Sequence, residues 1–130
     1  MIDHISIAVR DLAASRDAYA AILAPLGLRM LVERPRTVGF GKTYPEFWLN
    51  LREELKSAKG DPGSHICLRA RSEEAVRAFH EAALAHGCTS AGDPGPRRGE
   101  MTGYYGAFIL DSDRNKIEVA TFPRKEGETG

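Results

Sequence analysis

Several features that would mark a specialised class of protein are scarce in this sequence. The 18 Lys and Arg residues balance 18 Asp and Glu residues, so no net charge attracts nucleic acid or an anionic membrane. Only two cysteines occur, in different expected elements, which excludes a disulfide framework. No apolar run approaches the roughly 20 residues of a membrane span, and no signal peptide precedes the first expected strand. We therefore expect a cytoplasmic protein without nucleic-acid or membrane partners.

The remaining composition is that of one globular domain. The chain has 130 residues, of which 42% are hydrophobic and 28% are charged. This length is enough for one compact core and too short for two ordinary domains. We treat residues 1–130 as a single domain, with a polar tail at 123–130.

A pattern of one strand, one helix and further strands occurs twice along the chain. In module one, residues 1–60, we expect a helix at 12–23 and strands at 2–9, 28–33, 37–41 and 46–51. In module two, residues 61–122, we expect a helix at 73–85, strands at 64–68, 104–110 and 116–121, and an exposed loop at 92–103 in place of a clear second strand. This repeat predicts an α+β fold in which two βαβββ modules form a curved, mostly antiparallel sheet around a cleft.

Alternation within three expected strands separates aliphatic side chains from chemically active ones. The aliphatic positions, which should face the helices, are Ile5, Ile7, Ile66, Leu68, Ile117 and Val119. The opposite positions hold His4, His65 and Glu118, which should therefore face the cleft. Two imidazoles and one carboxylate with open positions suit Fe, Mn, Ni or Zn. The pattern predicts a divalent metal site, formed either within one chain or between two.

The predicted ligands belong to three longer segments, namely Asp3-His4-Ile5, Ser64-His65-Ile66 and the run from Leu110 to Glu118. With these segments the chain resembles, over nearly its whole length, the vicinal oxygen chelate superfamily, which includes glyoxalase I, extradiol dioxygenases, and fosfomycin- and bleomycin-resistance proteins. The resemblance implies paired βαβββ modules and, in many relatives, a homodimer. It also implies a small-molecule substrate and a metal ion held at His4, His65 and Glu118.

One departure from the glyoxalase pattern concerns the fourth strand. Glyoxalase I has a second glutamate there, which binds the metal and moves a proton. Glu46 has the matching parity and precedes Asn50 by four positions, but it follows Pro45 directly, at the start of the strand. Glu46 is thus a candidate metal ligand or catalytic base, and a solvated strand end is the alternative interpretation.

A second departure concerns the substrate-binding face. If Leu110 pairs with Lys116, Phe108 lies opposite Glu118, where extradiol dioxygenases and fosfomycin-resistance proteins have a tyrosine. Tyr104 shares this face and offers a phenol, and Trp48 offers an apolar wall. Arg97 and Arg98 are either anion-binding or solvated. We expect His80 and His86 to be exposed or flanking. Cys67 shares the face of His65, and we expect it to be a small buried thiol, with a place in the lining of the cleft as the alternative.

Three functions follow from these residues. The first is a divalent-metal-dependent lyase or isomerase that chelates adjacent substrate oxygens and uses a base such as Glu46. The second is a metal-free protein that sequesters an aromatic compound with Trp48, Tyr104 and Phe108, similar to the bleomycin-resistance proteins. The third is an extradiol dioxygenase, which keeps the three metal ligands but lacks a hydroxyl at Phe108.

Overall fold

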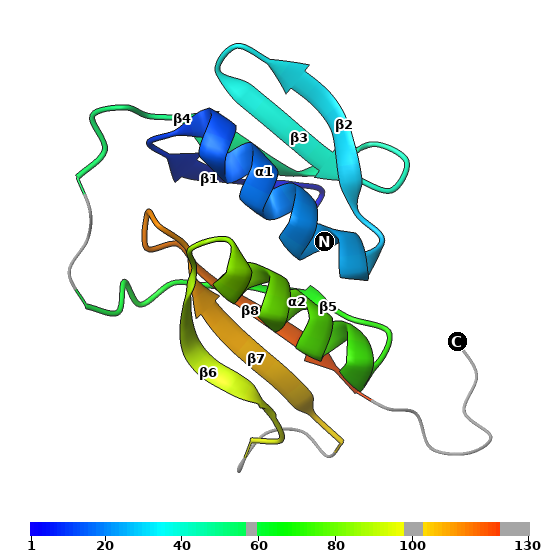
Figure 1. The fold of residues 1–130 in the computed structure, drawn as a ribbon. Helices are drawn as coiled ribbons and strands as arrows, with labels where there is room; N and C mark the ends of the chain where they lie inside the picture. Colours follow the sequence, from blue (N-terminus) through cyan, green and yellow to red (C-terminus); the bar gives the residue numbers. More distant parts are fainter. Residues whose placement is uncertain (57–59, 98–102, 123–130) are drawn as a thin grey trace.

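The computed structural model describes residues 1–56, 60–97 and 103–122. Its first unit comprises β1 (Ile5–Val9), α1 (Leu12–Leu23), the 3-10 turn η1 (Ala24–Leu26), β2 (Arg29–Arg34), β3 (Thr37–Gly41) and β4 (Pro45–Leu51). Its second unit comprises β5 (Ile66–Arg69), α2 (Glu73–Ala85), β6 (Thr89–Gly95), β7 (Tyr105–Leu110) and β8 (Lys116–Thr121). The units are arranged one beside the other (Figure 1).

Each unit contains one four-stranded sheet, with strand orders β1-β4-β3-β2 and β5-β8-β7-β6. The pairs β1–β4 and β5–β8 are parallel, and the remaining pairs are antiparallel. The predicted α+β fold with two βαβββ modules is therefore confirmed. The sheets do not close into a barrel. Among the described residues, no helix has the length and apolar character needed to cross a bilayer.

Side-chain caps define where both helices begin. The carboxylate of Asp11 accepts a hydrogen bond from the backbone nitrogen of Ala14 at 3.0 Å, and the hydroxyl of Ser72 accepts one from Ala75 at 3.1 Å. Each bond satisfies a backbone donor that the first helical turn leaves unpaired. Both helices span the predicted residues.

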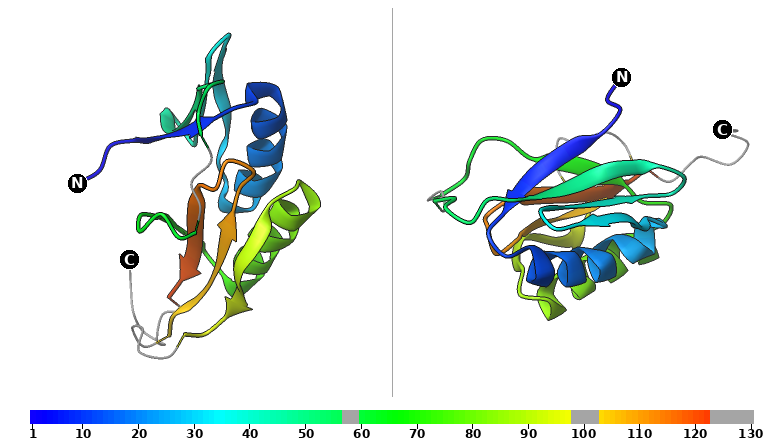
Figure 2. Two further views of the ribbon diagram at one scale, coloured as in Figure 1. Left: turned by 90° about the vertical axis from the view of Figure 1, so that its left-hand side faces the viewer. Right: turned by 90° about the horizontal axis from the view of Figure 1, so that it is seen from above.

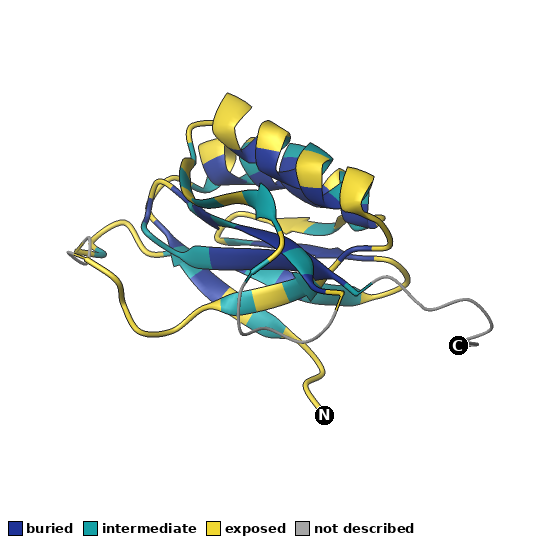
Figure 3. Ribbon diagram, turned by 90° about the horizontal axis from the view of Figure 1, so that it is seen from below, coloured by how far each residue is buried: buried dark blue, intermediate teal, exposed yellow. Residues whose placement is uncertain are grey.

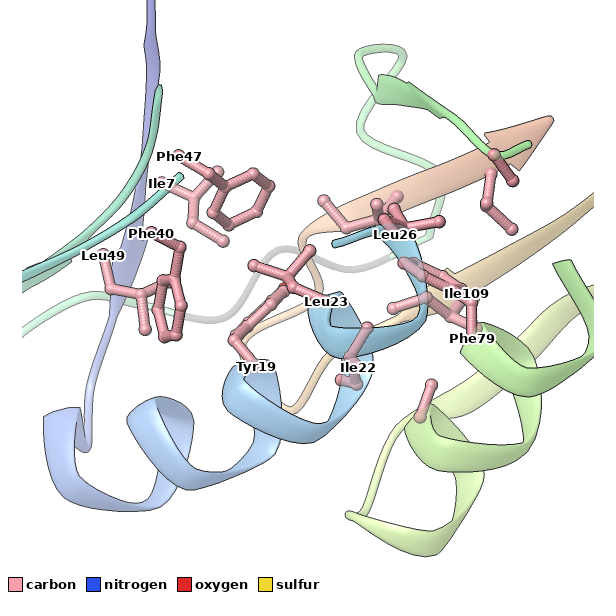
Figure 4. Close-up of a cluster of buried hydrophobic side chains, with 14 of the residues drawn as sticks. Ile7, Tyr19, Ile22, Leu23, Leu26, Phe40, Phe47, Leu49, Phe79 and Ile109 are labelled. Atoms are coloured by element: carbon pink, nitrogen blue, oxygen red, sulfur yellow. The ribbon is translucent and has the colours of Figure 1, made fainter. Parts of the chain in front are cut away.

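The two helices lie on one side of the sheets and leave the other side without a helical cover (Figures 2 and 3). The core fills the space between the helices and the sheets, as Figure 4 shows for Tyr19, Phe40 and Phe47 in the first unit. Ile7 is 8% exposed, and Ile117 and Val119 are fully buried. The predicted aliphatic face is thus the core face, and alternation directs the opposite positions to the open face.

The turn between β7 and β8 joins the two units. The hydroxyl of Tyr19 donates to Asp111 Oδ2 at 2.7 Å, and the amide nitrogen of Asn115 donates to the backbone oxygen of Ala8 at 2.9 Å. Arg10 Nε donates to Asp113 Oδ1 at 2.7 Å. Because this turn leads directly into β8, these bonds also hold the strand of Glu118 against the first unit.

Three expected boundaries were wrong. Strand β1 begins at Ile5 rather than at residue 2, and β5 begins at Ile66 rather than at residue 64, so His4 and His65 both precede their strands. Strand β6 continues to Gly95, through part of the expected loop 92–103. A glycine- and proline-containing run can form a strand here because β6 lies at the sheet edge and its register shifts on both sides of Gly92. Arg98 and the expected tail 123–130 lie outside the described residues.

Two expectations of burial were also wrong. His80 is only 7% exposed, and its Nε2 lies 2.8 Å from Ser90 Oγ, because it lies on the side of α2 that faces β6. Cys67, in contrast, is exposed. It lies on the sheet face that no helix covers, opposite Glu118, so the buried role is wrong and a place in the lining of the site stays a prediction.

Candidate metal centre

Two of the predicted ligands meet on the open face of the second sheet. His65 lies immediately before β5, and Glu118 lies in the middle of β8, which pairs with β5 in parallel. His65 Nε2 is 2.9 Å from Glu118 Oε1. The carboxylate side chain is 12% exposed and the imidazole is 41% exposed. The pair therefore combines a fixed, buried oxygen donor with a nitrogen donor that is open to solvent.

Tyr104 holds the second oxygen of this carboxylate. Its hydroxyl donates to Glu118 Oε2 at 2.6 Å, and its ring contacts Phe122 edge-on with the ring centroids 5.6 Å apart. Burial, followed by the hydrogen bond to Glu118 and its negative charge, raises the pKa of Tyr104 well above its usual value. The phenol therefore stays protonated at neutral pH and acts as a donor that orients the carboxylate. The sequence indicated a phenol on this face and did not indicate that it binds Glu118.

Phe108 forms an apolar wall beside the pair. It lies opposite Glu118 in the β7–β8 register, as predicted, and its ring meets His65 edge-on with the centroids 5.5 Å apart. Two cations also lie against this ring, since the guanidinium carbon of Arg97 is 5.7 Å from its centroid and Lys116 Nζ is 5.2 Å from it. The site thus combines two metal-type donors, an aromatic surface and positive charge.

The other predicted residues belong to the first unit. His4 is exposed, and its Nδ1 lies 2.7 Å from Asp3 Oδ1 rather than near Glu118. Glu46 and Trp48 are half-buried on β4. Within the part of the chain that the structure describes, no three side chains of His, Cys, Asp or Glu converge as a metal site. A single chain thus brings His65, Glu118, Tyr104 and Phe108 together and leaves His4, Glu46 and Trp48 apart from them.

The repeat clarifies the position of Glu46. Ile5 pairs with Phe47 in the first sheet, and Ile66 pairs with Ile117 in the second. His4 therefore corresponds to His65, and Trp48 corresponds to Glu118. Glu46 is two residues before this position, about 7 Å along the strand. That offset is too large for a ligand equivalent to Glu118, but it leaves Glu46 level with His4 on the neighbouring strand.

Comparison with known proteins identifies the family of the chain. A sequence profile described as Glyoxalase/Bleomycin resistance protein/Dioxygenase superfamily matches residues 1–119. The chain belongs to this superfamily. Its members act on small molecules and commonly bind divalent metals. None of the curated proteins searched matches the sequence.

Solved structures of the superfamily share the fold. A glyoxalase/bleomycin resistance protein from Albidiferax ferrireducens T118 is 30% identical, with a TM-score of 0.80, and the match covers 92% of this chain and 97% of that one. The fosfomycin resistance protein FosX from Listeria monocytogenes is 19% identical, with a TM-score of 0.66, and the match covers 93% and 92% of the two chains. The fold of the superfamily thus extends over nearly the whole chain.

The donors in the second unit suit the metal ions of the superfamily. Imidazole nitrogen and carboxylate oxygen are ligands of Zn, Ni, Mn and Fe. Two such donors at 2.0–2.2 Å from one ion, at a right angle, are about 3 Å apart, and the separation of His65 and Glu118 is 2.9 Å. The hydrogen bond from Tyr104 supplies the outer support that ligating carboxylates usually have. His65 and Glu118 therefore fit a divalent metal, and a complete site needs a further donor.

Proposed function

We propose that this protein is a divalent-metal-dependent enzyme, a lyase or isomerase of the glyoxalase type, which acts on a small molecule through two adjacent oxygens. The observation that carries this proposal is the His65–Glu118 pair, held by Tyr104 on an open sheet face. A bound metal would act as a Lewis acid for negative charge that develops on the substrate oxygens. Phe108 would contact the substrate from the same chain. Trp48 and Glu46, which lie apart from Phe108 within one chain, would reach the substrate from a second copy, where Trp48 would enclose it and Glu46 would move its proton.

We further propose that His4 completes the metal site in a second copy of the chain, so that the active form is a homodimer. The segment that holds His4 extends away from the helical layer on the open side of the sheets (Figure 2). Met1 and Ile2, next to it, are the most exposed large apolar residues of the described chain, at 124% and 79%. A twofold dimer in which this segment reaches the partner would form two equivalent sites. Each site would contain His4 from one chain and His65 with Glu118 from the other.

Mixing two inactive variants tests both proposals. We expect His4→Ala and Glu118→Ala each to lose Zn²⁺ binding in isothermal titration calorimetry. When the two variants are unfolded together and refolded as a mixture, about a quarter of the wild-type sites should return. Half of randomly paired dimers are mixed, and each mixed dimer rebuilds one of its two sites.

The outcomes separate the two proposals. If the site forms within a single chain, the mixture binds no more metal than the separate variants. If wild-type protein takes up none of Zn²⁺, Ni²⁺, Mn²⁺ or Fe²⁺, the metal-dependent function is wrong. Glu46→Ala is the matched control. It also removes a glutamate from a strand, but Glu46 lies in the first unit, two residues before the position that corresponds to Glu118. It should bind Zn²⁺ as the wild type does.

A metal-free binding protein is the second candidate. The observation that favours it concerns Trp48, which takes the position equivalent to Glu118 in the first sheet. The Trp48 ring lies over Gly39, where an added Cβ atom would be 2.9 Å from a ring carbon. An aromatic ligand that changes Trp48 fluorescence in the absence of metal and is not converted would support this function. Oxygen uptake with catechol and Fe(II) would instead support the extradiol dioxygenase.

A further inference from the structure

Arg97 places a positive charge beside the candidate metal centre. It follows β6, and its guanidinium lies over the ring of Phe108, with 5.7 Å between the guanidinium carbon and the ring centroid. Phe108 is paired with Glu118 and contacts His65. The guanidinium therefore lies one aromatic ring away from the two metal-type donors, on the same face of the sheet.

Gly92 provides the space in which this guanidinium lies. A Cβ atom at Gly92 would be 2.6 Å from Arg97 Nη2 and 3.2 Å from Phe108 Cδ2. Arg97 Nη2 also donates to the backbone oxygen of Asp93 at 3.1 Å. The cation is thus seated between a glycine, an aromatic ring and a carbonyl. This arrangement positions it before any ligand binds, which lowers the entropic cost of using it.

Arg97 and Lys116 both lie on the ring of Phe108, but they differ in whether a carboxylate pairs with them. Lys116, on the same aromatic ring, forms an ion pair with Asp61 at 2.9 Å. Among the described residues, no carboxylate lies within ion-pair distance of Arg97. Its one described hydrogen bond to another residue ends on a neutral carbonyl oxygen. Further guanidinium donors therefore remain for an anion, which they can bind in a bidentate manner.

We propose that Arg97 recognises a negatively charged group of the substrate, so that the site selects small molecules with a carboxylate next to the two chelating oxygens. This inference rests on the proposed function, because it names the substrate class of that same site. Arg97 is a specificity-determining residue in this scheme. Phe108 separates the anion from the metal ligands and would stack on a planar part of the substrate.

A matched pair of probes isolates the contribution of the anion. Catechol and 3,4-dihydroxybenzoate both present two adjacent oxygens and differ by one carboxylate. We expect Zn²⁺-loaded protein to bind 3,4-dihydroxybenzoate at least about tenfold more tightly than catechol in isothermal titration calorimetry, since a hydrogen-bonded charge pair contributes that much or more. In Arg97→Gln the ratio of the two affinities should fall to about the ratio with which the same two compounds bind Zn²⁺ in water without protein.

Two glycine variants on β6 provide the structural control. Gly92→Ala should reduce the preference, because the added methyl group displaces the flexible end of Arg97. The same methyl group would be 3.2 Å from Phe108 Cδ2, so Zn²⁺ affinity is measured beside the preference to detect any shift of Phe108 against His65. Gly95→Ala should keep the full preference, because a Cβ there meets nothing within 4 Å. Both variants are conservative changes in the same edge strand, so a different effect on the preference cannot be attributed to strand stability alone.

Each result is decisive for one of the two proposals. Equal affinity of the wild type for both probes, or an unchanged preference in Arg97→Gln, would overturn the role of Arg97 even when Zn²⁺ binds normally. If Zn²⁺ does not bind, the metal-dependent function is wrong, and the two probes are compared on the metal-free protein. On the metal-free protein we still expect tighter binding of 3,4-dihydroxybenzoate than of catechol, and this preference should depend on Arg97. If the preference is absent, the inference about Arg97 is wrong, whether or not the protein binds metal.

Discussion

At the scale of single residues, Tyr104 is the clearest test of the metal centre. Its hydroxyl donates to the carboxylate oxygen of Glu118 that does not face His65. We expect Tyr104→Phe to weaken Zn²⁺ binding about 10- to 100-fold, since outer-shell hydrogen bonds to ligands usually have this effect. Isothermal titration calorimetry measures the change directly.

Tyr105→Phe is the control for this prediction. The two tyrosines are adjacent, but the Tyr105 hydroxyl accepts a hydrogen bond from Arg77 of α2 at 3.3 Å, on the helical side of the sheet. The Tyr105→Phe variant should therefore leave the Zn²⁺ affinity unchanged. Equal affinities for both variants and the wild type would mean that Glu118 needs no support from Tyr104, or that Glu118 is not a ligand.

At the scale of elements, the turn between β7 and β8 determines how the units dock. The side-chain nitrogen of Asn115 donates to the backbone oxygen of Ala8 and to Asp111 Oδ2, each at 2.9 Å. We expect Asn115→Ala to lower the free energy of unfolding by about 2–4 kcal/mol, because the Ala8 carbonyl and the Asp111 carboxylate each lose one hydrogen bond, although Asp111 Oδ2 keeps the bond from Tyr19. Ser112→Ala, an exposed position in the same turn, should change it by less than about 0.5 kcal/mol. Urea unfolding followed by circular dichroism compares them, and similar values for the two variants would contradict this role.

Most of the element structure could be predicted from local patterns. Both helices begin directly after a residue whose side chain caps them, and alternation in β8 correctly separated Ile117 and Val119 from Glu118. The same alternation, with the hairpin register, predicted that Phe108 faces Glu118. Strand β6 was partly missed because its pairing at the sheet edge compensates for a sequence of weak strand propensity. Local patterns failed where tertiary contacts decide the structure.

At the scale of the whole molecule, the alternation of side chains along a strand shows on which face of its sheet a residue lies. It does not show which sheet faces come together in the folded protein. His65 and Glu118 come together because both belong to one sheet, whose pairing follows from the chain path. His4 takes the corresponding position in the other sheet, but the packing of α1 beside α2 sets the units side by side rather than face to face. The metal role of all three residues stays a prediction that depends on a second copy of the chain.

The two cysteines test whether a second copy covers the open face. Cys67 is exposed and lies opposite Glu118 in the β5–β8 register, whereas burial raises the pKa of Cys88 to about 12. If a partner covers the site, iodoacetamide should modify Cys67 at least about tenfold more slowly in Zn²⁺-loaded wild type than in His4→Ala, which cannot complete the site. Cys88 should react slowly in both, because almost none of it is thiolate at pH 8, and it therefore serves as the internal control. Peptide mass spectrometry over a time course gives both rates. Rapid modification of Cys67 in both proteins would mean that the face stays open when Zn²⁺ is present, and the site shared between two chains would then be wrong.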